Sequence, residues 1–162
     1  MRATHLLGCL LLASLTLAAQ GPGRGLRALR TSAKLRIDGR LDEPIWSQAP
    51  VATGFTQEWP ERGVPARQRT EVRVLYNDRF LFIGARMHHD PKLDGGGSQV
   101  VRRLHRRDQD SQSDWFGVAI DSIHNHRSAL LFEVNAAGVQ KDQLIYNDST
   151  YDPSWDGVWE SA

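Results

Sequence analysis

The feature that most constrains this chain is a strict alternation of apolar and polar side chains in several short segments. In residues 70–76, Val72, Val74 and Tyr76 recur at every second position. A period of two places successive side chains on opposite faces of a strand, so one face can be buried. The same pattern predicts further strands over residues 80–87, 115–121, 129–134 and 139–146, and a sixth that begins at 158–160.

Turn residues separate these segments at short intervals, which is typical of hairpins. The one predicted helix spans residues 43–48. It follows an Asp38-Gly39 turn, with Asp42 at the N-cap position and Pro44 in the first turn. Its Trp46 is expected to be a core residue. Hairpins with almost no helix predict an all-β fold, namely an antiparallel, jelly-roll-like β-sandwich with one short N-terminal helix.

The N-terminus predicts export. Arg2 precedes an uncharged apolar run over residues 6–17, and small residues follow at Ala18 and Ala19, as in a secretory signal peptide. The alternatives to a cleaved signal peptide are a signal anchor and lipidation at Cys9. We expect a signal peptide over residues 1–20, a linker over 21–32 and one folded domain over 33–162, in a protein that is secreted, periplasmic or associated with the outer membrane.

Composition excludes some classes of partner. Lys and Arg number 20 and Asp and Glu number 19, so the formal net charge is +1. This balance gives no attraction to nucleic acid. The sequence also lacks a G-x-S-x-G elbow, an H-E-x-x-H pair and a P-loop. We therefore expect a protein that is not an enzyme.

An ordered set of motifs carries a family resemblance over residues 37–160. The set comprises Ile37-Asp38-Gly39-Arg40-Leu41-Asp42-Glu43-Pro44-Ile45-Trp46, the segments 70–78 and 80–84, Arg106-Arg107-Asp108 with residues 114–121, Phe132-Glu133-Val134-Asn135, Gly138-Val139-Gln140-Lys141-Asp142 and Trp155-Asp156-Gly157-Val158-Trp159-Glu160. Together these resemble the module similar to carbohydrate-binding family 9 that large secreted bacterial proteins carry before a barrel-like region.

The resemblance implies a non-catalytic carbohydrate-binding module that binds poly- or oligosaccharide, in a setting of carbohydrate catabolism. It also implies that the last strands of the module are missing here. One Trp of the family's sugar-binding pair would lie near Ser111 or Gln112, and Glu133 stands where the sugar binders carry an Arg. These departures leave an alternative, a structural domain that docks on a membrane-associated barrel region without binding sugar.

Four residues are the expected sugar contacts. Glu133 and Asn135 alternate with the apolar Phe132 and Val134, and Trp115 should share their face. An exposed indole can stack on a sugar ring, and planar polar groups match its hydroxyls. The alternative for Trp115 is packing under a loop. The predicted carbohydrate-binding residues are Arg107, Trp115, Glu133 and Asn135.

The acidic run after Arg107 offers oxygen ligands for calcium, although it lacks the Gly and terminal Glu of an EF-hand loop. The candidate ligands are Asp108, Asp110 and Asp114, with Asp148, Asp152 and Asp156 as a second set. An ordinary solvated loop is the alternative. The adjacent pairs Arg102-Arg103 and Arg106-Arg107 could bind phosphate or an acidic polysaccharide, but the acidic run favours ion pairing within the loop.

Overall fold

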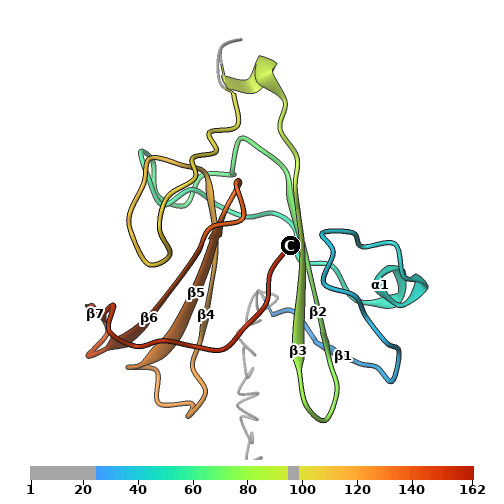
Figure 1. Ribbon diagram of the computed structural model, residues 1–162. Coiled ribbons are helices and arrows are strands. Elements are labelled where there is room, and N and C mark those ends of the chain that lie inside the picture. Colours follow the sequence, from blue (N-terminus) through green and yellow to red (C-terminus); the bar gives the residue numbers. More distant parts are fainter. Residues whose placement is uncertain (1–24, 95–98) are drawn as a thin grey trace, which may run out of the picture.

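The computed structural model describes residues 25–94 and 99–162, and strands dominate this part of the chain (Figure 1). Its elements are β1 (Leu29–Arg30), α1 (Pro44–Gln48), β2 (Thr70–Tyr76), β3 (Leu81–Met87), the 3-10 turn η1 (Pro91–Asp94), β4 (Trp115–Ile120), β5 (Ala129–Asn135), β6 (Gln140–Tyr146) and β7 (Thr150–Asp152). They form a three-stranded sheet in the order β1-β2-β3 and a four-stranded sheet in the order β4-β5-β6-β7. The predicted all-β class is confirmed, whereas closure into a jelly-roll-like sandwich stays a prediction.

The structure differs from the sequence-based expectation at both ends of the described chain. Residues 29–30, which the sequence placed in a linker, pair in parallel with the end of β2. The amide of Thr31 extends this pairing by donating to the Tyr76 carbonyl at 2.9 Å. The folded part therefore begins before Ala33. The predicted signal peptide, with Cys9, lies outside the described residues.

At the other end, the predicted strand at 158–160 is wrong. Trp155 and Trp159 instead lay their indoles against Phe132, with ring centroids 5.6 and 5.4 Å away. Residues 153–162 thus cross the face of the four-stranded sheet, and Figure 1 shows them running from that sheet toward the other. A strand that the sequence did not predict, β7, pairs with β6 after a turn in which Asn147 and Asp148 both have positive φ.

A compact apolar cluster lies where α1 packs on the three-stranded sheet. Trp46 is 6% exposed and Leu75 has no exposed surface, which confirms Trp46 as a core residue. Glu43, not Asp42, is the N-cap, and its carboxylate binds the Trp46 Nε1 at 3.1 Å instead of a helix amide. The other members of the cluster are Ala49, Leu29, Leu35, Leu41, Ile45 and Phe82.

The register of the four-stranded sheet decides which side chains share a face. Trp115 lies opposite Asn135, and Gly117 lies opposite Glu133. On the other face, Phe132 lies opposite Asp142. We call the two sides the Trp115 face and the Phe132 face. Among the described residues, no helix is long and apolar enough to cross a bilayer.

Candidate functional site

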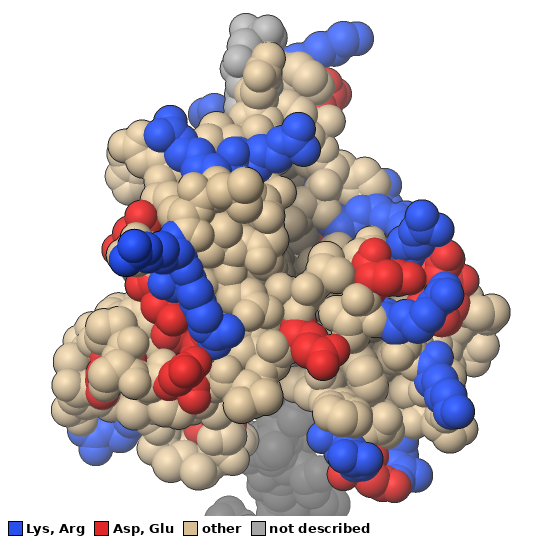
Figure 2. All heavy atoms as spheres, viewed as in Figure 1, with Lys and Arg blue, Asp and Glu red and all other residues tan. Residues whose placement is uncertain are grey.

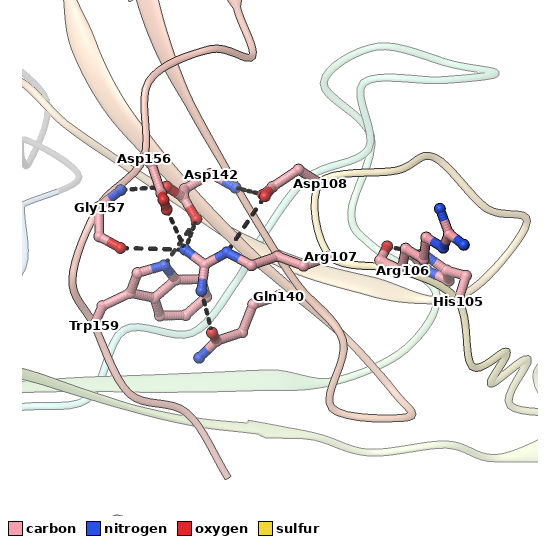
Figure 3. Close-up of polar contacts among 9 residues, drawn as sticks. All are labelled: His105, Arg106, Arg107, Asp108, Gln140, Asp142, Asp156, Gly157 and Trp159. Atoms are coloured by element: carbon pink, nitrogen blue, oxygen red, sulfur yellow. Dashed lines mark hydrogen bonds and ion pairs between the residues drawn. The ribbon is translucent and has the colours of Figure 1, made fainter.

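The Arg107 side chain is held by a network on the Phe132 face of the sheet (Figure 3). Its Nη1 donates to Gln140 Oε1 at 2.8 Å. Its Nη2 donates to Asp142 Oδ1, to Asp156 Oδ1 at 3.0 Å and to the Gly157 carbonyl at 3.1 Å. Its Nε forms an ion pair with Asp108 Oδ2 at 3.3 Å. The predicted sugar contact Arg107 is therefore engaged in internal contacts.

Asp142 is the centre of this network. Its side chain has no exposed surface, so its charge must be matched by donors inside the protein. Besides Arg107, the donors are the Gly157 amide at 2.5 Å and the Trp159 Nε1 at 3.1 Å. We call this group the Asp142 cluster; its members are Arg107, Asp108, Gln140, Asp142, Asp156, Gly157 and Trp159.

The Asp142 cluster joins three of the motifs on which the family resemblance depends. They come from the loop before β4, from β6 and from the C-terminal segment, which are far apart in sequence. Their convergence has a structural role, because it fastens residues 156–159 to the middle of β6. It also separates Arg107 from the other three predicted sugar contacts, which lie on the Trp115 face.

Asn135 and Trp115 share one face, as the sequence predicted, but both are covered. Asn135 is 5% exposed. Its Nδ2 donates to the Arg103 carbonyl at 2.9 Å and lies 3.2 Å from His105 Nε2. The Trp115 indole donates to the Ser111 carbonyl at 3.3 Å, and the His105 ring lies 5.6 Å from it. Trp115 therefore packs under the loop, which is the alternative that the sequence left open.

Glu133, the third predicted contact on the Trp115 face, has polar side chains around it. Its Oε2 accepts from Gln143 Nε2 at 3.4 Å and lies 3.6 Å from Lys141 Nζ. Opposite it, Gly117 is exposed and adds no side chain. Burial lowers the pKa of Lys141, but its hydrogen bond to Asp110 and the charge of Glu133 outweigh that effect and raise the pKa.

Sequence reasoning missed Lys141 and Gln143 as members of this face. The alternation in this strand could have indicated them, because Lys141 and Gln143 flank Asp142 and so face the other way. In the sheet, Lys141 lies opposite Glu133 and Gln143 lies opposite Leu131. The register between β5 and β6 was needed to place them. Together with Glu133 they form a small group of carboxylate, ammonium and amide side chains beside Gly117.

The predicted calcium ligands do not converge. Asp110 pairs with Lys141 Nζ at 2.5 Å, and this hydrogen bond lowers the pKa of Asp110. Asp114 Oδ2 accepts from the Val101 amide at 2.9 Å, and Asp108 pairs with Arg107. In residues 25–94 and 99–162, no group of three or more His, Cys, Asp or Glu side chains is arranged to hold a metal. Neither acidic set is therefore gathered into a metal site within this part of the chain, and calcium binding stays a prediction.

Two hollows lie elsewhere on the molecule. One of about 500 Å³ is lined by Arg30, Asn77 and Arg79 among others, and one of about 180 Å³ lies beside Trp46 and Glu71. None of the predicted sugar contacts lines either hollow. The candidate surface is the Trp115 face with the loop that covers its edge, and it lies apart from both hollows.

Comparison of the chain with protein-family models, with curated proteins and with solved structures finds no match.

Proposed function

We propose that this protein is a non-catalytic carbohydrate-binding module that binds poly- or oligosaccharide through the Trp115 face of its four-stranded sheet. The observation that carries the proposal is the register, which gathers Trp115, Glu133 and Asn135 on one face. The ordered motifs that resemble carbohydrate-binding family 9 support it further. Export to the periplasm or the cell exterior, where such glycans occur, is part of the proposal.

The polar group beside Gly117 has the chemistry that hydroxyl recognition needs. The Glu133 carboxylate accepts hydrogen bonds, Lys141 donates, and the Gln143 amide does both. Glu133 and Lys141 are 22% and 16% exposed, so they are held in place and still partly accessible. A site built on strands and fixed by neighbouring contacts loses little side-chain entropy when a ligand binds.

A glycan array followed by titration calorimetry of the hits tests the proposal. We expect binding of at least one glycan, weakened by Glu133→Gln. Glu160→Gln is a matched control, because Glu160 is an exposed carboxylate outside the sheets. Absence of binding across a broad panel by the folded protein would contradict the proposal, as would equal effects of the two substitutions.

A second candidate is a structural domain that docks on a membrane-associated barrel region. The observation that favours it is the internal use of Arg107 and Asn135, since both side chains are already satisfied by contacts within the chain. This candidate predicts no glycan binding at all. It also predicts that cross-linking of the protein in cell envelopes captures an outer-membrane partner through the same face.

A further inference from the structure

Three arginines next to the Trp115 face have no carboxylate partner in the part of the chain that the structure describes. Among the described residues, the side chains of Arg102, Arg103 and Arg106 form no ion pair, whereas Arg107 forms three. The sequence favoured ion pairing of this basic cluster with the acidic run that follows it. That expectation is wrong for three of the four arginines, because the acidic side chains bind elsewhere.

The acidic side chains are committed to other partners. Asp108 and Asp156 pair with Arg107, and Asp110 pairs with Lys141. Asp114 accepts from the Val101 amide. A positive charge in contact with a carboxylate is largely neutralised at a distance, whereas an unpaired guanidinium keeps its field. Residues 102–106 therefore keep three positive charges close together in sequence without a paired carboxylate, although the net charge of the whole chain is only +1.

The backbone of this segment is fixed. The Asp114 amide donates to the Val101 carbonyl at 2.8 Å, and the Arg103 amide donates to Ser113 Oγ at 3.1 Å. Asn135 binds the Arg103 carbonyl, and the His105 ring rests against Trp115. These contacts hold the inner side of the segment against the sheet. We call residues 102–106 the arginine belt.

The outer side of the arginine belt is open to solvent. Leu104 is 85% exposed, and Arg102, Arg103 and Arg106 are all exposed. Figure 2 shows Lys and Arg side chains gathered over the upper part of the view, where Figure 1 draws this segment in yellow. At the edge of the Trp115 face, the Trp115 indole is covered. The accessible groups there are three guanidinium groups and one apolar side chain, all from the arginine belt.

We propose that the arginine belt binds an anionic glycan, one that carries uronate or sulfate groups; this rests on the function proposed above and names its ligand class. Guanidinium groups match carboxylate and sulfate oxygens in a bidentate geometry. The apolar Leu104 side chain can contact the C–H face of a sugar ring between two charged groups. Several exposed arginines on one fixed segment can contact successive charges of a polymer, so their contributions combine.

The test compares two triple variants that change the net charge equally. The belt variant is Arg102→Gln/Arg103→Gln/Arg106→Gln. The control is Arg40→Gln/Arg67→Gln/Arg127→Gln, whose arginines are exposed and have no side-chain partner among the described residues. Titration calorimetry uses polygalacturonate and dextran sulfate as anionic probes and dextran as a neutral one. Circular dichroism establishes that both variants fold.

We expect the wild-type protein to bind both anionic probes but not dextran, with an affinity that falls as salt rises. The belt variant should bind more than tenfold more weakly, because each lost exposed ion pair is worth up to about fivefold. The control variant should change by less than about threefold. Equal losses in the two variants would overturn the proposal, because the effect would then follow net charge alone.

Two other outcomes would also overturn it and separate it from the proposed function. If neutral glycans bind and both anionic probes fail, the carbohydrate-binding function stands and the arginine belt is not its contact surface. If no glycan of either kind binds, while vesicles with anionic lipid do, both proposals fail and the belt is a membrane contact.

Discussion

Asp142, in the middle of β6, accepts a hydrogen bond from the indole Nε1 of Trp159 at 3.1 Å. This contact fastens the C-terminal segment to the sheet by a side chain that has no exposed surface. The Trp159 ring then packs edge-on against Phe132, whose neighbour across the ladder is Asp142 itself. The buried Asp142 carboxylate thus fixes the hydrogen bonds of residues 156–159 and, through them, the position of the Trp159 ring against Phe132.

Replacing Asp142 by Asn is expected to lower the free energy of unfolding by about 3 kcal/mol, the lower end of the range for breaking a buried ion pair. The lower end applies because Arg107 is 39% exposed and can be partly solvated. Asp156→Asn is the matched control, since Asp156 binds the same guanidinium but is 79% exposed. It should cost less than about 1 kcal/mol. Urea denaturation measures both, and equal costs would show that burial does not matter here.

Gly84→Ala is expected to destabilise the protein by about 1–3 kcal/mol, as overpacking of a core usually does. A Cβ at this position would lie 2.8 Å from Trp46 Cζ3 and 2.9 Å from Leu41 Cδ2, inside the apolar cluster. At the exposed Gly117, the nearest atom to a Cβ would be Cγ of the flexible Glu133 side chain at 3.3 Å, and Leu131 Cδ1 would lie at an ordinary contact distance of 3.9 Å. Gly117→Ala should therefore be close to neutral. A thermal melt of each variant checks the difference, and a neutral Gly84→Ala would contradict the packing described here.

Glu71 is expected to make stability depend on pH in the acid range. Its hydrogen bond with Arg73 lowers its pKa below the ordinary 4.5; burial opposes this effect, and the charge of Arg69 adds to it. The unfolded chain therefore takes up the proton first as pH falls, so the stabilisation is present above about pH 4.5 and is lost below it. Urea midpoints between pH 7 and pH 3 should fall less steeply in Glu71→Gln than in the wild type. Parallel curves would exclude this residue as a cause.

Trp59 is expected to account for most of the solvent-accessible tryptophan fluorescence. It is 84% exposed, whereas Trp46 is 6% exposed and the other three indoles are half-buried. Trp59→Phe should shift the emission to the blue and reduce acrylamide quenching. Its unfolding free energy should stay within about 0.5 kcal/mol, as for most surface substitutions.

Trp46→Phe provides the opposite control for the fluorescence measurement. It should lower stability while leaving quenching nearly unchanged. Undiminished quenching in Trp59→Phe would show that another indole is accessible. The same Trp59→Phe background is suited to glycan titrations by fluorescence, because any remaining response must come from another indole, including Trp115.

The strands were predicted well because the alternation of apolar and polar residues that marks a strand can be read from neighbouring positions in the sequence. β2 has the predicted bounds, and β3 to β6 differ from theirs by one residue at an end. The alternation also placed Trp115 and Asn135 on one face, on condition that their strands pair in the expected register, and the observed pairing of the two residues meets that condition. β1 was missed because two residues carry no measurable period, and their pairing with Leu75–Tyr76 depends on a contact distant in sequence.

The candidate site was harder to predict because burial and partner choice are properties of the folded chain. The sequence offered Arg107 and the acidic run as neighbours, but only the fold brings Asp142 and Asp156 to that guanidinium. Only the fold, likewise, brings the His105 ring into contact with the Trp115 indole. Residue type alone therefore predicted the correct face for Trp115 and Asn135 and the wrong degree of exposure.

The strap formed by residues 156–159 has a consequence for biosynthesis. The ribosome completes both sheets before it makes these residues, so until the strap emerges Phe132 lacks its Trp159 contact and Asp142 has Arg107 but lacks its Gly157 and Trp159 donors. Nascent intermediates of this kind attract chaperones and misassociate easily. Late engagement of the strap would therefore lengthen the time for which the nascent chain needs chaperone protection.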